Sequence, residues 1–122
     1  MPLMSTEYFQ IKSTQSIHLM EVSLPEQIDS VEFDRVSERM LGSLEGKAGE
    51  RWVLDLANVS YMGSAMLGLM VNVRQQIKSA SGTLVLCSLS PRLTEIFHAC
   101  CLERLFTIVR SQPDALRRAG EN

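Results

Sequence analysis

The fold is decided by the stretch Trp52-Val53-Leu54-Asp55-Leu56, a nearly continuous apolar run. A run of this kind is typical of a strand that is covered on both faces of a sheet. A second one, Thr83-Leu84-Val85-Leu86-Cys87, follows a helical segment that extends from Ser64 to about Ser79. Two buried strands joined by a helix predict a parallel β-α-β unit with a right-handed crossover.

The segments before this unit predict a hairpin and a helix. Residues 8–12 and 17–22 both resemble strands, and turn-forming residues separate them. Asp29 then stands as a helix cap, with Glu32 three positions further on, as in a capping box. Within residues 33–44, apolar side chains recur at offsets of 3, 7, 8 and 11, which form one stripe of an α-helix.

The segments after the unit continue the alternation of strands and helices. Ser90 and Pro91 supply a cap and a first-turn proline for a third helix. Residues 106–109 resemble a last strand, and Pro113 opens a short C-terminal helix. The predicted order is β-β-α-β-α-β-α-β-α, which is an α/β fold with a mixed, mostly parallel sheet and flanking helices. We expect one domain over residues 1–122.

The composition argues against several classes of partner. The formal net charge is -2 and the sequence pI is about 5.7. Proteins that bind nucleic acid usually present a basic face, and none is visible here. No apolar stretch approaches the roughly 18 residues that a membrane span needs, and the N-terminus shows no secretory signal. We therefore expect a cytoplasmic protein that binds no nucleic acid.

No motif for catalysis, a metal or a cofactor is visible. The three cysteines, Cys87, Cys100 and Cys101, lack the C-x-x-C spacing of a zinc or redox site, and we predict that all three are small buried hydrophobes. The two histidines, His18 and His98, lie outside zinc-ligand motifs, and His98 is predicted to be exposed on a helix. Glycine-rich phosphate loops are absent. The sequence therefore predicts neither an enzyme nor a cofactor site.

Ser64 stands where the second helix is predicted to begin. One interpretation is that its hydroxyl caps this helix and does nothing else. Another is that Ser64 is modified, because a phosphate there would carry about -1.5 to -2 and meet the positive end of the helix dipole. The first turns are apolar almost all the way round, through Ala65, Met66, Leu67, Leu69, Met70 and Val71. Either part of this surface faces solvent and marks a protein contact, or neighbouring loops bury it.

At these residues the sequence resembles the STAS family, which is named for sulfate transporters and anti-sigma-factor antagonists. The family signature in stand-alone antagonists is an apolar strand, a short loop, and then Asp-Ser-Ser-Gly-Leu-Gly or Asp-Ser-Thr-Gly-Leu-Gly at a helix start. Here the stretch reads Gly63-Ser64-Ala65-Met66-Leu67-Gly68, so that the family's phospho-acceptor falls on Ser64. The resemblance extends over about residues 9–116. It includes residues 82–91, and residues 24–29 occupy the place of the family's Gly-Glu-Leu-Asp loop.

Three residues depart from the family signature. Gly63 replaces the aspartate that helps to present the serine to a kinase in the family, and Ala65 replaces a second hydroxyl residue. Met66 replaces a glycine, and we expect it to add apolar area to the contact surface. These departures predict an altered partner specificity or a weakened switch.

The resemblance implies a regulatory binding module of the anti-sigma-factor-antagonist type that is not an enzyme. It would bind a serine-kinase anti-sigma factor or a related protein kinase, and phosphorylation of Ser64 would switch it, with a phosphatase as a further candidate partner. The partner-binding residues implied are Asp29, Asp55, Gly63, Ala65, Met66, Leu67 and Ser88.

Two other functions stay open. One is a constitutive, non-phosphorylated scaffold subunit of a transport or sensory complex. The other is a module that binds a small ligand or nucleotide in the crevice beyond the strand ends. The first predicted strand could also be an open edge through which two copies associate.

Overall fold

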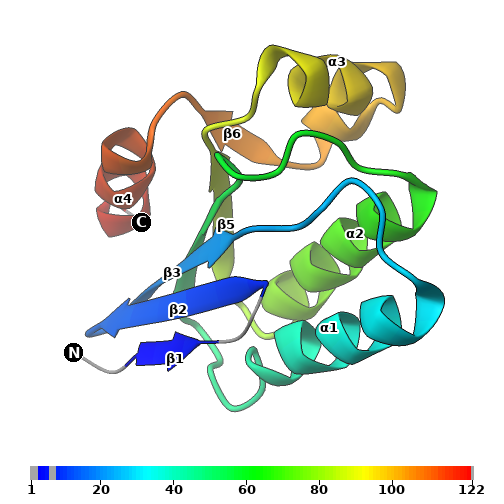
Figure 1. The fold of residues 1–122 in the computed structure, drawn as a ribbon. Coiled ribbons are helices and arrows are strands. Elements are labelled where there is room, and N and C mark those ends of the chain that lie inside the picture. Colours follow the sequence, from blue (N-terminus) through cyan, green and yellow to red (C-terminus); the bar gives the residue numbers. More distant parts are fainter. Residues whose placement is uncertain (1–2, 6–7, 122) are drawn as a thin grey trace.

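A six-stranded mixed sheet forms the centre of the protein, with the strands in the order β1-β2-β3-β4-β5-β6 (Figure 1). The computed structural model describes residues 3–5 and 8–121. The pairs β1–β2 and β2–β3 are antiparallel, and β3 to β6 run parallel to one another. The strands are β1 (Leu3–Ser5), β2 (Phe9–Thr14), β3 (Ile17–Val22), β4 (Arg51–Asp55), β5 (Thr83–Cys87) and β6 (Thr107–Val109).

The predicted α/β fold and the predicted order of its elements are confirmed, with one additional strand. The sequence does not predict β1, because three residues are too few for an alternating pattern to be recognised. Since β1 pairs with β2, the expectation that the segment 8–12 forms an open sheet edge is wrong.

Four helices cover the two faces of the sheet unequally. They are α1 (Ser30–Gly42), α2 (Ser64–Ser79), α3 (Pro91–Ala99) and α4 (Gln112–Gly120), and a short 3-10 helix, η1 (Leu102–Arg104), follows α3. The first three pack on one face and α4 alone lies on the other (Figure 1). None of the described helices is both long enough and apolar enough to cross a membrane.

Alternation along β4 explains how one strand serves both faces. Side chains of a strand point to opposite faces in turn, so Trp52 and Leu54 enter the core beneath α1, α2 and α3, whereas Val53 packs toward α4. On the α4 side the core is small and includes Ala115 and Ala119 of the helix. Every residue from 52 to 56 is buried, as predicted for a central strand.

The cysteine prediction is only partly correct. Cys87 is buried at the end of β5, but Cys100 and Cys101 are exposed. The helical pattern of α3 ends at Ala99, and Cys101 adopts a left-handed backbone (φ 58) that turns the chain into η1. Residues past the end of the helix therefore leave its buried face. His98 is exposed, as predicted.

Candidate functional site

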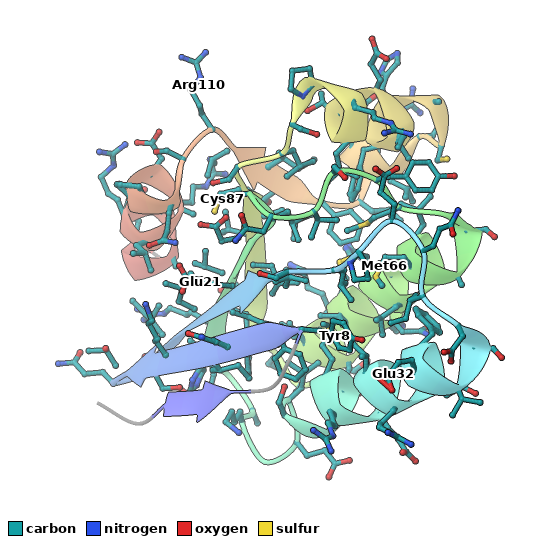
Figure 2. All side chains as sticks on the ribbon, in the orientation of Figure 1. Tyr8, Glu21, Glu32, Met66, Cys87 and Arg110 are labelled. Atoms are coloured by element: carbon teal, nitrogen blue, oxygen red, sulfur yellow. The ribbon has the colours of Figure 1, made fainter. Side chains whose placement is uncertain are left out.

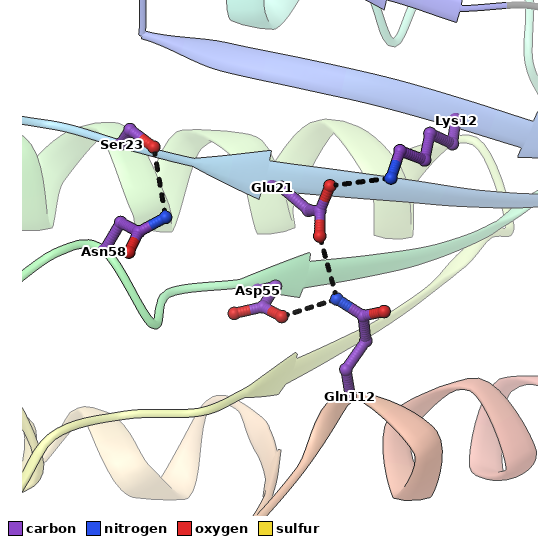
Figure 3. Close-up of polar contacts among 6 residues, drawn as sticks. All are labelled: Lys12, Glu21, Ser23, Asp55, Asn58 and Gln112. Atoms are coloured by element: carbon purple, nitrogen blue, oxygen red, sulfur yellow. Dashed lines mark hydrogen bonds and ion pairs between the residues drawn. The ribbon is translucent and has the colours of Figure 1, made fainter.

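Three loops meet at the edge of the sheet where the parallel strands end. They are residues 23–29 after β3, 56–63 after β4 and 88–90 after β5. The amide of Asn58 donates a hydrogen bond to Ser23 Oγ at 3.4 Å, which ties the first two loops together (Figure 3). This edge is the usual place for binding sites in parallel sheets.

Helix α2 begins at Ser64, as predicted, but its N-cap is the preceding residue. Gly63, in extended backbone (φ -83, ψ -177), is the N-cap, and it provides no side chain for capping. The prediction that Ser64 caps the helix is therefore wrong, because Ser64 is the first helical residue. Its side chain is exposed. Among the described residues, Ser64 Oγ has no hydrogen-bond partner, so the hydroxyl is available to another protein.

Some apolar side chains of α2 are buried in the core, and others are accessible at the candidate site. Met66, Leu69 and Met70 are buried, whereas Leu67 is half-buried and Ala65 is exposed. Met66 is only 8% exposed, and it lines a pocket beside Ser64, so its part in partner contact stays a prediction. Residues at helical spacings of three and four share one face, and that face packs on the sheet.

A pocket of about 460 Å³ lies beside Ser64, between the loop after β3 and the starts of α1 and α2. Its apolar lining includes Leu24, Ile28, Phe33, Tyr61 and Met66. Glu26 is the charged residue of the lining, which contains no lysine or arginine. Because most of this lining is apolar, it fits an apolar side chain of a protein.

Arg92 links three elements at the rim of this pocket. Its Nη1 lies 3.3 Å from Glu26 Oε1, and its guanidinium lies 4.9 Å from the centre of the Tyr61 ring. One arginine thus connects the first turn of α3 to the loop after β3 and to the loop after β4. Sequence reasoning did not identify these three residues, because no motif spacing connects them.

Asp55 is buried, and its carboxylate is used within the chain. Asp55 Oδ1 accepts a hydrogen bond from the Ala57 amide at 2.9 Å, and Oδ2 accepts one from Gln112 Nε2 at 2.6 Å. Gln112 also donates to Glu21 at 3.1 Å, and Glu21 pairs with Lys12 at 3.2 Å (Figure 3). Asp55 therefore does not lie on a contact surface, contrary to the prediction. It holds the start of the site loop and the first residue of α4.

Cys87 is the register partner of Asp55 on the neighbouring strand. Burial raises the pKa of its thiol to about 11; the Ser88 hydrogen bond opposes this, and the charges of Asp55 and Glu21 add to it. At neutral pH the thiol is protonated, and it is a weak nucleophile. Among the described residues, no group of three or more His, Cys, Asp or Glu side chains is placed to hold a metal ion.

The remaining predicted contact residues, Asp29 and Ser88, lie outside the lining of the pocket. Asp29 is exposed and caps α1, accepting a bond from the Glu32 amide at 2.8 Å, as predicted. Ser88 has a left-handed backbone (φ 65), and its amide donates to the carbonyl of Arg110 at 3.3 Å. The side chain of Arg110 extends away from the body of the molecule (Figure 2). The structure thus gathers Gly63, Ser64, Ala65 and Leu67 at one surface and places Ser88 against another loop.

Comparisons with known proteins agree with this architecture. The STAS domain family matches residues 8–115 of the chain. BtrV of Bordetella bronchiseptica, provisionally named an anti-sigma factor antagonist, is 33% identical over 78 residues, which are 64% of this chain and 67% of BtrV.

Two solved structures share the fold at lower sequence identity. An anti-sigma-factor antagonist (STAS) domain protein from Planctomyces limnophilus superposes with a TM-score of 0.79 at 19% identity, over 92% of this chain and 97% of that one. The Bacillus cell fate determinant SpoIIAA in its phosphorylated form gives 0.65 at 16% identity, over 90% and 97%. With the family match over most of its length, the chain belongs to the STAS domain family and is of its anti-sigma-factor-antagonist type.

Proposed function

We propose that the chain is a regulatory binding module that is switched by phosphorylation of Ser64. In its unmodified form it binds a serine-kinase anti-sigma factor or a related protein kinase, and the partner contacts the surface at the start of α2. The observation that carries the proposal is the Ser64 hydroxyl, which is exposed, free of hydrogen bonds among the described residues, and beside an apolar pocket. A relative that shares the fold, SpoIIAA, is known in a phosphorylated form.

The physical basis of the switch is the cost of burying charge. A partner that covers Ala65 and Leu67 and enters the pocket also covers the position of Ser64. A phosphate there carries about -1.5 to -2. Burying it without a matched cation on the partner is unfavourable, and each 1.4 kcal/mol weakens binding about tenfold. The modified chain therefore dissociates.

Phosphoryl transfer would use the kinase's ATP, and this chain would contribute the acceptor. Ser64 Oγ attacks the γ-phosphorus, the bond between that phosphorus and the bridging oxygen of ADP breaks, and a base on the kinase takes the hydroxyl proton. Because Gly63 has no side chain, position 63 supplies no carboxylate to the acceptor that follows it. The kinase must then orient the serine through other contacts, such as the pocket next to it.

The test is phosphoryl transfer in a defined mixture. A serine-kinase anti-sigma factor that copurifies with the chain is incubated with it and ATP, and the products are analysed by mass spectrometry. We expect one phosphate, on the peptide that contains Ser64, and none on the Ser64→Ala variant. Ser90→Ala, which changes the serine at the start of α3, is the matched control and should be modified as the parent is. A parent chain that binds this kinase but stays unmodified contradicts the proposal.

A second function is favoured by Gly63 itself. Without the family's aspartate, the chain could be a constitutive scaffold that docks on a transport or sensory complex and is not phosphorylated. The two functions differ in how a negative charge at position 64 affects partner binding.

A further inference from the structure

Arg92 pairs with one anion, Glu26, at the rim of the pocket whose lining would carry a second, the phosphate on Ser64. It lies in the first turn of α3, and its side chain is 58% exposed, so it is free to change rotamer. At present it pairs with Glu26, at 3.3 Å, and stacks on Tyr61. Both of these residues line the pocket that Ser64 also lines.

The Tyr61 ring brings Arg92 close to the start of α2. A Cβ atom built on Gly63 would lie 3.8 Å from Tyr61 Cε2 and 3.9 Å from its hydroxyl oxygen. The ring that carries the guanidinium on its face is therefore also next to the residue that precedes Ser64. The Tyr61 ring thus connects Arg92 to the part of the pocket lining that contains Ser64.

The present partner of Arg92 is the weaker of the two anions. Glu26 is 52% exposed, and exposed ion pairs of this kind contribute little. A phosphate on Ser64 would carry more charge than a carboxylate and has three acceptor oxygens. Guanidinium groups bind phosphate through two parallel hydrogen bonds, which adds strength and geometric specificity. Arginine would therefore exchange the carboxylate for the phosphate.

We propose that Arg92 is the internal phosphate-binding residue of the modified chain, taking the Ser64 phosphate in place of Glu26. This inference rests on the proposed function, because it names the residue that binds the same phosphate. The exchange releases the loop after β3 from α3 and leaves the Glu26 carboxylate unpaired at the rim of the pocket. Phosphorylation then changes the partner surface at two places, the added phosphate and the freed loop.

The test places the phosphate without a kinase. Phosphoserine is incorporated at position 64 during translation, and its second pKa is measured by phosphorus NMR. Glu26 and Tyr61 are the titratable groups of the pocket lining, and neither lowers this pKa by attraction. We expect Arg92 to hold the second pKa below its usual value of about 6, and Arg92→Gln to raise it by roughly half a unit. Arg110→Gln, at an exposed arginine that extends away from the molecule, is the control and should change nothing.

A second measurement uses amide resonances to monitor the loop after β3. In the phosphorylated parent, amide resonances of residues 25–28 should shift relative to the unmodified chain, and in phosphorylated Arg92→Gln the shift should be lost. Equal second pKa values in the parent and in Arg92→Gln overturn the inference. Because the phosphoserine is incorporated during translation and needs no kinase, a failure of every kinase to modify Ser64 would contradict the proposed function and leave this measurement decisive by itself.

Discussion

Helices α2 and α3 begin at the same edge of the sheet, each after a parallel strand, but they use their serines differently. At α3, Ser90 is the N-cap in extended backbone (φ -65, ψ 162), and its Oγ accepts a bond from the Leu93 amide at 3.1 Å. At α2 the cap position belongs to Gly63, and Ser64 follows it inside the helix. A serine at the cap is engaged in structure, whereas a serine one residue later presents a free hydroxyl. The contrast teaches that a shift of one residue separates a serine that caps a helix from one that does not.

The largest expected effect is on partner binding. Ser64→Asp places a negative charge inside the proposed contact, where burying it without a matched cation lowers affinity about a hundredfold. Ser90→Asp adds the same charge at the neighbouring helix start and keeps the cap, because aspartate is also a good N-cap. Its affinity should stay within about twofold of the parent. Titration calorimetry with the partner measures both, and unchanged binding by Ser64→Asp would favour the scaffold function instead.

The next effect concerns the strand ends that precede the two helices. Asp55 ends β4, and Asp55→Ala removes two acceptors, leaving Gln112 and the Ala57 amide without them. Losing buried bonds to a charged group should lower the free energy of unfolding by about 2 kcal/mol. Glu21→Ala removes only one acceptor of the same glutamine at a half-exposed position and should cost less than about 1 kcal/mol. Urea denaturation compares the variants; equal losses would show that Asp55 is not the main anchor of α4.

Cys87, at the end of β5, should make the free energy of unfolding depend on pH. Burial raises the pKa of the Cys87 thiol from 9.0 to about 11, so between these values an unfolded chain loses the proton while the folded chain keeps it. The contribution is fully present below pH 9 and is lost as the pH rises through 11. Compared with Cys87→Ala, the parent should lose on the order of 1–2 kcal/mol over this interval. Denaturation at several pH values measures the difference, and parallel profiles for the two chains would contradict it.

The two serines should also differ in what they contribute to stability. Ser90→Ala removes a side-chain cap and should lower the free energy of unfolding by about 1 kcal/mol. Ser64→Ala removes an exposed hydroxyl that bonds to none of the described residues, and it should change the free energy of unfolding by less than about 0.5 kcal/mol. The midpoints of urea unfolding measure both. If Ser64→Ala is as destabilising as Ser90→Ala, the hydroxyl is engaged and the contrast between the helices fails.

Local patterns predicted the elements and left the contacts between them open. The bounds Ser64–Ser79 follow from apolar spacing and from Gly82 beyond the helix end, and the structure has the same bounds. The cap of α2 could not be assigned from the sequence, because glycine and serine are both accepted at that position and the backbone chooses between them. Arg92 and Glu26 lie 66 residues apart, and no local pattern carries information about such a pair. The same holds for Asp55 and Gln112, 57 residues apart, whose bond turned an expected contact residue into an internal anchor.

The smallest effect would come from making the start of α2 resemble that of α3. Gly63→Asp introduces a side chain that can accept a bond from a first-turn amide, in the backbone conformation that a cap needs. The new Cβ would be in ordinary contact with Tyr61, at 3.8 Å, so nothing has to move. The gain over a glycine cap should be a few tenths of a kcal/mol, seen as a slightly higher unfolding midpoint.

Gly63→Asn separates this gain from the effect on phosphorylation. Asparagine caps about as well as aspartate but carries no charge, so the two variants should be about equally stable. If the family's carboxylate presents the serine to the kinase, only Gly63→Asp should accelerate the modification of Ser64, as followed by mass spectrometry over time. Equal acceleration by both would mean that the ordering of the helix start, and not the charge, limits the transfer. If neither variant is modified faster than the parent, the kinase recognises this chain by contacts at the pocket beside Ser64. Gly63 is then not the residue that weakens the switch.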